Sequence, residues 1–195
     1  MSKKIKKSIS IFIIIILIVV AIISTFFIIR YFSEKNKINT VYETYSNENI
    51  QNNIETKQVS NSQDLMLEVN GEKVIGIIKI EKIGFEGCIY EGTSMNTLDK
   101  GIGHFENSPY LNGNVCLAGH NYNNVWAKLH TLQHGDKITY TSFLGTKDYK
   151  VNRITTINEN DWTLLKNTNE NILTLITCVH KKPALRLVVQ AIEDL

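Results

Sequence analysis

The chain has little cysteine: three residues in 195, at Cys88, Cys116 and Cys178. Three thiols cannot build the disulfide framework of a small secreted domain, and an odd count outside a membrane leaves a free thiol. Cys88 and Cys116 lie within apolar runs, where a cysteine usually serves as a small buried hydrophobic residue. A Cys88–Cys116 disulfide is the alternative that the sequence leaves open.

Clusters of metal-ligating residues are also missing. No Cys-x-x-Cys pair and no His/Cys cluster has the spacing of zinc ligands, so we expect no structural metal.

A basic stripe is absent as well. The formal net charge of +2 arises near the N-terminus, because the residues from 64 onward include 13 basic and 15 acidic side chains. Nucleic acid is therefore not an expected partner.

Charge is absent from residues 9–29, whose polar members are Ser10, Ser24 and Thr25. As a helix, this stretch would span about 31 Å, the thickness of a bilayer's hydrocarbon core. Four lysines precede it and a single Arg30 follows, which predicts a cytoplasmic N-terminus and an outer location for the rest. A cleaved signal peptide usually has a shorter apolar core of about 7–15 residues, so we expect an uncleaved, single-pass signal anchor.

The segment after the anchor is polar, rich in Asn, Glu, Lys and Ser, and has no Gly or Pro from residue 31 to residue 63. Ile38, Val41 and Tyr45 fall at helical spacing, which indicates a helix that continues past the membrane. We expect a solvated tether over residues 47–63. The predicted organisation is a cytoplasmic basic segment (1–8), a transmembrane anchor (9–29), a polar linker (30–63) and an outer domain (64–195).

The outer domain consists of short runs that are rich in β-branched residues or alternate in polarity. These runs cover residues 74–80, 85–90, 114–118, 136–140, 148–157, 171–177 and 186–192. Short helical candidates lie at residues 124–130 and 161–165. Seven or eight short strands with few helices predict a mostly β barrel or sandwich of about 130 residues.

Three reactive side chains, His120, Cys178 and Arg186, stand at or near the ends of such runs. If they converge at one edge of a β-structure, they supply a proton carrier, a nucleophile and an oxyanion stabiliser. A thiolate attacks an amide carbonyl, an imidazolium protonates the leaving amine, and a guanidinium binds the tetrahedral intermediate. No Asp or Asn is tied to His120 by the sequence, and Arg186 makes a charge-relay triad the less expected arrangement.

Four segments carry a family resemblance. Residues 101–104 and 108–109 read GIGH and SP, residues 113–120 read GNVCLAGH, residues 173–178 read LTLITC, and residues 186–189 read RLVV. In this order, and after a membrane anchor, they resemble the sortases, the cysteine transpeptidases of Gram-positive cell surfaces. The resemblance covers about residues 70–193, and WAKL at 126–129 followed by GDKI at 135–138 supports it.

The resemblance implies an eight-stranded β-barrel with short helices. It implies Cys178 as nucleophile, His120 as acid and base, Arg186 as the group that steadies substrate and oxyanion, and Thr177 as a substrate contact. The implied reaction cleaves an LPxTG-like C-terminal sorting signal of a surface protein between Thr and Gly. The acyl group passes through Cys178 to an amine of a cell-wall precursor or of another protein, such as a pilin.

No cofactor is implied for the family as a whole, although one sortase class binds calcium. Glu106 and the Glu-Asn-Asp sequence at residues 159–161 lie in loops that suit such ligands, but solvated loop carboxylates are the expected state. The motifs do not assign the class.

Other cell-wall cysteine enzymes match the sequence less well. L,D-transpeptidases carry a compact S-H-G-C-x-R motif, which is absent from this sequence. Papain-like peptidoglycan peptidases place the cysteine before the histidine, whereas here His120 precedes Cys178. The remaining alternative is a non-enzymatic, membrane-anchored extracellular β-domain for wall assembly or adhesion, in which no thiol would have privileged reactivity.

Overall fold

The structure is a computed structural model that describes residues 3–52, 66–69 and 71–194. The chain divides into two compact units, Met1–Asn39 and Thr40–Leu195.

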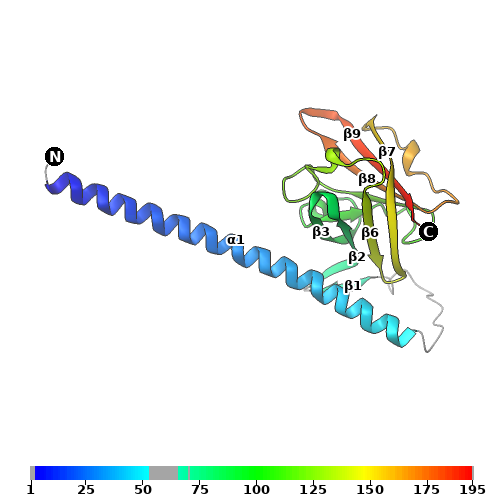
Figure 1. Ribbon diagram of the computed structural model, residues 1–195, viewed down its shortest axis with the longest axis horizontal. Helices are drawn as coiled ribbons and strands as arrows, with labels where there is room; N and C mark the ends of the chain where they lie inside the picture. Colours follow the sequence, from blue (N-terminus) through cyan, green and yellow to red (C-terminus); the bar gives the residue numbers. More distant parts are fainter. Residues whose placement is uncertain (1–2, 53–65, 70, 195) are drawn as a thin grey trace. The chain divides into compact units, whose positions relative to one another are not determined.

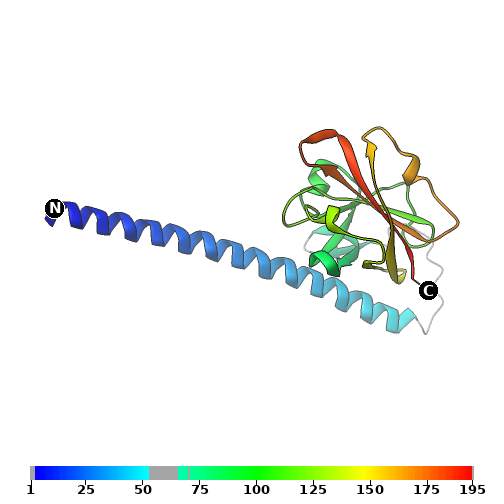
Figure 2. The same ribbon diagram turned by 45° about the horizontal axis from the view of Figure 1, so that its top comes forward.

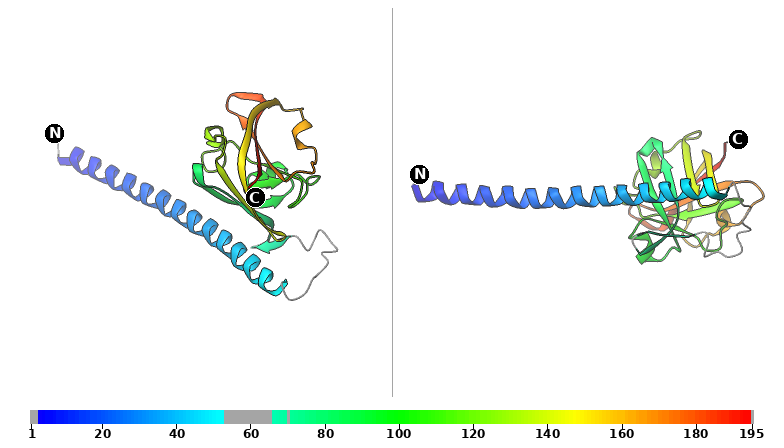
Figure 3. Two further views of the ribbon diagram at one scale, coloured as in Figure 1. Left: turned by 45° about the vertical axis from the view of Figure 1, so that its right-hand side comes forward. Right: turned by 90° about the horizontal axis from the view of Figure 1, so that it is seen from below.

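The N-terminal part is a single helix, α1 (Lys3–Asn52), which Figure 3 shows without a break from two directions. The stretch Ile11–Val41 is long and apolar enough to cross a membrane. Its large apolar side chains up to Ile29 are about half exposed or more, so the helix presents an apolar surface of the kind that lipid covers. An N-terminal apolar helix of this length fits a single-pass membrane anchor.

The helix continues beyond the apolar stretch, as the spacing of Ile38, Val41 and Tyr45 indicated. Residues 47–52, which we expected in a tether, are helical as well, because no Gly or Pro interrupts the chain there. Residues 53–63 of the expected tether lie outside the described residues.

The described part of the second unit contains nine strands. They are β1 (Leu67–Val69), β2 (Glu72–Ile80), β3 (Phe85–Glu91), β4 (Ile102–His104), β5 (Asn114–Ala118), β6 (Lys137–Ser142), β7 (Gly145–Asn158), β8 (Ile172–Val179) and β9 (Lys182–Glu193). Their order in the sheet is β1-β2-β3-β4-β5-β8-β9-β7-β6, and β6 also pairs with β2. The eight strands other than β1 therefore close a barrel (Figures 1 and 2). Strand β1 pairs with β2 and adds a ninth strand to the sheet. The predicted eight-stranded β-barrel is confirmed.

Barrel closure depends on a glycine. Gly76 of β2 pairs with Ser142 of β6, and a Cβ atom at Gly76 would lie 2.4 Å from the carbonyl oxygen of Thr141. Only a residue without a side chain lets the two strands approach this closely. Closure leaves the barrel strands without an unpaired edge, which removes a surface for edge-to-edge aggregation.

The helices of the barrel unit are shorter than the sequence indicated. The candidate at 124–130 is a turn followed by a 3₁₀ helix at Leu129–Thr131, and the candidate at 161–165 is a 3₁₀ helix at Thr163–Leu165. Segments this short cannot close several i→i−4 hydrogen bonds, so tertiary packing decides their shape. The GIGH segment forms a strand of its own, β4, between β3 and β5.

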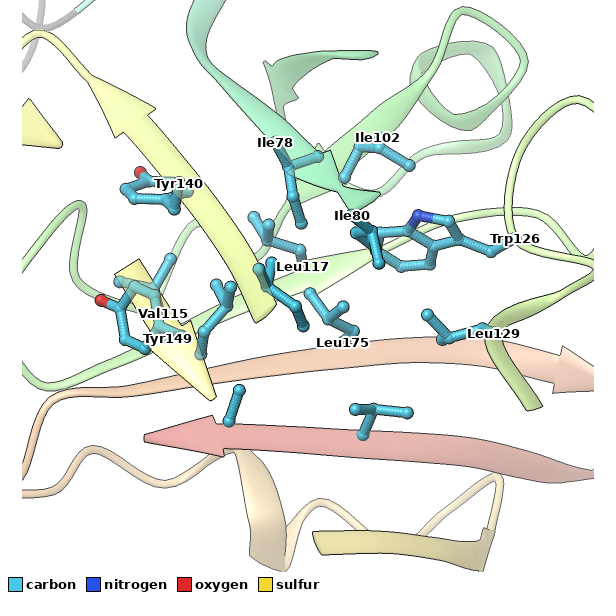
Figure 4. Packing of buried hydrophobic residues seen from close by; sticks show 14 of the residues in the cluster. Ile78, Ile80, Ile102, Val115, Leu117, Trp126, Leu129, Tyr140, Tyr149 and Leu175 are labelled. Carbon is cyan, nitrogen blue, oxygen red and sulfur yellow. The ribbon is translucent and has the colours of Figure 1, made fainter. Parts of the chain in front are cut away.

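One hydrophobic core fills the barrel. Figure 4 shows Trp126 and Leu129, from the connection after β5, packed with Ile80 of β2 and Leu175 of β8. All four side chains are fully buried. Each such side chain contributes about 1.5–3 kcal/mol of burial free energy. The packing holds the connection after β5 against the end of the barrel, where the reactive residues lie.

Candidate active site

Three neighbouring strands place the reactive residues in a row. The parallel strands β5 and β8 pair Ala118 with Ile176, and the antiparallel strands β8 and β9 pair Cys178 with Arg186. Continuing the β5–β8 register by two residues puts His120 beside Cys178. Side chains alternate along a strand, so all three belong to the same face. Antiparallel pairing of β8 with β9 therefore places Cys178 beside Arg186.

Two hydrogen bonds extend the pairing past the end of β5. The Gly119 amide donates to the Ile176 carbonyl at 3.1 Å, and the Asn121 side-chain amide donates to the Cys178 carbonyl at 2.8 Å. A Cβ atom at Gly119 would lie 2.7 Å from the Trp126 ring, so this glycine lets the strand pass close to the core. The backbone on both sides of His120 is thus fixed to the backbone that carries Cys178.

Cys178 is the accessible thiol. None of the three cysteines is in a disulfide; Cys88 and Cys116 are buried, whereas Cys178 is exposed. The disulfide that the sequence left open is therefore not formed. Burial raises the pKa of the Cys116 thiol to about 12, so this thiol stays protonated near neutral pH. Among the three, Cys178 is the one that a substrate can reach.

His120 is held between two side chains. Its Nε2 atom lies 3.2 Å from Oδ1 of Asp99, and its ring stacks on Tyr122 at a centroid distance of 4.6 Å. The side chain of His120 is 12% exposed, whereas that of Asp99 is 62% exposed. No carboxylate partner for His120 was predicted, because Asp99 lies 21 residues earlier and outside any motif. The fold alone brings them together.

Arg186 is tied to its own hairpin and to the connection between β7 and β8. Its Nη1 donates to the carbonyls of Pro183 and Leu185, at 2.5 and 3.0 Å, and its Nη2 lies 2.9 Å from Oε2 of Glu159. Within residues 71–194, no hydrogen bond joins the guanidinium to Cys178 or His120. The three groups line one cavity, which leaves room for a substrate group among them.

Thr177 belongs to the opposite face of β8 from Cys178. It is 3% exposed, and its hydroxyl has no hydrogen-bond partner among the described residues. Its expected role as a substrate contact stays a prediction.

Two cavities meet at Cys178. One of about 430 Å³ is lined by His120, Cys178 and Arg186, with an apolar lining that includes Ile157 and the exposed Trp162. The other, of about 760 Å³, lies next to the turn after β8 and has Tyr122 and His180 in its wall. Cys178 and Thr177 line both cavities. The thiol is therefore approachable from two sides.

A family model described as the sortase domain matches residues 78–194. The chain belongs to the sortase family. Sortase D of Bacillus subtilis (strain 168) is 32% identical over 106 residues, which are 53% of this chain and 53% of that protein. Sortase A of Bacillus anthracis is 29% identical over 115 residues, 57% of this chain and 55% of that protein. These matches span about half the length of the curated relatives.

Solved sortase structures share the fold. A Clostridium perfringens Sortase D5 transpeptidase has a TM-score of 0.64 and 30% identity, over 83% of this chain and 98% of that one. Sortase A of Listeria monocytogenes has a TM-score of 0.57 and 26% identity, over 63% of this chain and 88% of that one.

Some residues of the sortase motifs have structural functions. The buried ring of His104 is hydrogen-bonded to Ser108 at 2.9 Å and to Glu91 at 3.2 Å, so it fixes the connection between β4 and β5. The Asn114 side chain donates to the carbonyls of Leu164 and Lys166, both at 2.9 Å. Asn114 thereby anchors the connection that carries Glu159 and Trp162, which form part of the smaller cavity.

The loop carboxylates considered as calcium ligands have other partners or lie exposed in this structure, and their calcium binding stays a prediction. Glu159 is paired with Arg186, Asp161 accepts hydrogen bonds from Thr163, and Glu106 is exposed. Both hydrogen bonds from Thr163 go to Oδ1 of Asp161 and lower the pKa of this carboxyl group. Within the described ranges, no three His, Cys, Asp or Glu residues group as metal ligands.

Proposed function

We propose that this sortase is a membrane-anchored cysteine transpeptidase that joins proteins with an LPxTG-like sorting signal to an amine. The single observation that carries the proposal is the placement of His120, Cys178 and Arg186 along one cavity and on one face of three adjacent strands. The family and the fold support the same chemistry.

The first half of the reaction forms a thioester. The Cys178 proton passes to His120, and the sulfur attacks the Thr carbonyl carbon of the sorting signal. The carbon–nitrogen bond to Gly breaks as the tetrahedral intermediate collapses, and the proton on His120 passes to the leaving amine. The surface protein is then bound to Cys178, and the glycine-containing fragment departs.

The second half transfers the acyl group. An acceptor amine attacks the thioester carbon and gives a proton to His120, and the carbon–sulfur bond breaks with the Cys178 thiolate as leaving group when the new amide forms. The proton then returns to sulfur. If water enters in place of the amine, the same steps hydrolyse the signal.

Arg186 stabilises the negative charge on the carbonyl oxygen in both halves. Its guanidinium is planar and permanently charged, so it offers hydrogen bonds at fixed angles. Glu159 and two backbone carbonyls hold it in place before the substrate arrives. Such preorganised donors lower the barrier because they need no reorientation as charge develops.

The two cavities suit the two substrates. The smaller one has an apolar lining and Arg186, which fits an extended sorting signal whose scissile carbonyl reaches the guanidinium. The larger one approaches Cys178 from the other side and is open to an incoming amine. Separate approaches let the acceptor enter while the acylated protein still occupies the first cavity.

The test of this function is a transfer assay with the full-length chain in detergent micelles. A library of LPxTG-like peptides is supplied with an amine such as triglycine. We expect new amide products that join the Thr residue of one peptide to the amine, with the Gly-containing fragment released. A chain that forms neither amide nor hydrolysis product with any peptide would favour a non-enzymatic surface domain.

We also propose that the barrel lies outside the cytoplasmic membrane. The four lysines before residue 9, against Arg30 alone directly after the apolar stretch, favour a cytoplasmic N-terminus. Protease added to intact protoplasts is expected to release a fragment of the barrel unit. If the barrel were cleaved only after lysis, the orientation would be the reverse.

A further inference from the structure

We infer that Asp99 is a positioning residue for the reaction. Its carboxylate binds Nε2 of His120, so that Nδ1 is the nitrogen that accepts the proton of Cys178. The sequence motifs contain no such partner. The inference rests on the proposed function only for the reaction and its substrates. The contact between Asp99 and His120 is observed within this chain.

The backbone of Asp99 is fixed independently of His120. Asp99 follows the short helix α2 (Met95–Leu98), and its amide donates to the Met95 carbonyl at 2.9 Å. Ser94 is the N-cap of this helix, and its hydroxyl accepts from the Thr97 amide at 3.2 Å. A carboxylate on a fixed backbone can orient the imidazole, whereas one on a mobile loop would follow it.

The ring of His120 has little freedom between its neighbours. Asp99 binds one ring nitrogen at 3.2 Å, and Tyr122 stacks with an interplanar angle of 22°. The Tyr122 carbonyl accepts from the amides of Val125 and Ala127, at 2.9 and 3.0 Å, which fixes the loop that carries it. Together these contacts set both the plane of the ring and its rotation.

The contact also selects the tautomer. A neutral imidazole that donates from Nε2 to a carboxylate keeps a lone pair on Nδ1. Nδ1 of His120 makes no hydrogen bond to any described residue, so it is free to accept the proton of Cys178. After that transfer the ring is an imidazolium, and the nearby carboxylate stabilises its charge.

The expected effect is moderate. A carboxylate that is 62% exposed interacts with its partner through solvent, which screens the attraction. The buried aspartate of a serine protease triad changes kcat by about 10⁴-fold. For an exposed pair we expect about three- to tenfold.

The test measures the rate at which iodoacetamide alkylates Cys178 in the full-length chain at pH 7, together with kcat and KM for a cleaved peptide. Asp99→Asn is expected to slow alkylation about three- to tenfold and to lower kcat with little change in KM. The asparagine amide can donate to Nε2, which favours the tautomer with its proton on Nδ1. Asp99→Glu, which keeps the carboxylate, is expected to restore part of the rate.

A matched control is Glu81→Gln. The Glu81 side chain is 61% exposed and pairs with Lys79 at 3.9 Å, so the variant removes a similar carboxylate with no histidine partner. We expect it to leave alkylation and turnover unchanged. In a His120→Ala background, Asp99→Asn should have no further effect on alkylation, because the carboxylate acts through the ring.

The inference is overturned if Asp99→Asn is alkylated within twofold of wild type, or if it slows alkylation equally in the His120→Ala background. Alkylation needs no sorting signal, so the two proposals fail separately. A slowed Asp99→Asn in a chain that transfers no peptide would support the role of Asp99 and contradict the proposed function. Normal alkylation of Asp99→Asn in a chain that transfers peptides would support the proposed function and contradict the role of Asp99.

Discussion

Cys178→Ala is expected to abolish peptide cleavage and thioester formation while the barrel stays folded. In the proposed mechanism the sulfur of Cys178 bonds to the substrate, and no other side chain that lines the smaller cavity is a nucleophile of similar strength. Its side chain is exposed, so removing sulfur leaves no buried cavity. We therefore expect a change in the free energy of unfolding within about 0.5 kcal/mol, as for other surface substitutions.

The matched control is Cys88→Ala. This cysteine is 1% exposed, so its loss is expected to destabilise the core by about 1 kcal/mol and to leave turnover of the folded protein intact. Thermal unfolding and peptide cleavage, measured on both variants, separate the two effects. Near-normal cleavage by Cys178→Ala would contradict the assignment of Cys178 as the nucleophile.

Substitution of Arg186 is expected to have the second largest effect. Removing one oxyanion donor typically costs about 10²–10³-fold in kcat, so we expect a loss in this range for Arg186→Ala. Arg186→Lys keeps the charge beside Glu159 but loses the planar fork, and we expect a smaller loss that still exceeds tenfold, about 1.4 kcal/mol. Steady-state kinetics on a cleaved peptide measure both.

Alkylation of Cys178 separates charge stabilisation from thiol reactivity. It should fall much less than turnover in Arg186→Ala, because the thiolate does not depend wholly on this donor. Arg153→Ala is the control, since Arg153 is an exposed arginine of β7, the neighbour of β9. If Arg186→Ala turned over peptide within threefold of wild type, the oxyanion site would lie elsewhere, with the backbone amides near Thr177 as the next place to look.

Most barrel strands were predictable because they have a strong local signal. β5 was predicted with its observed bounds, and β8 within one or two residues at each end, since both are apolar runs that enter the core. β1 and β4 have three residues each and carry no such periodicity. They exist because β2, β3 and β5 offer them hydrogen-bond partners, which depends on the assembled sheet.

The site was predictable where strand pairing fixes it. Cys178 and Arg186 face each other because β8 and β9 form a hairpin, and local sequence suffices for that conclusion. Asp99 and Glu159 were missed as partners because they reach the site from separate connections, 21 and 27 residues away in sequence from His120 and Arg186. Contacts of this kind follow from loop conformation, which the packing around Asn114 and α2 decides.

Mass spectrometry of the acyl-enzyme tests the central claim most directly. The full-length chain is mixed with LPxTG-like peptides, quenched in acid within seconds and digested. We predict a mass increase that matches the peptide up to its Thr residue, on the fragment that contains Cys178, and its loss after hydroxylamine treatment. An adduct on Cys88 or Cys116, or the same adduct on the Cys178→Ala variant, would contradict the assignment of Cys178 as the nucleophile of this sortase.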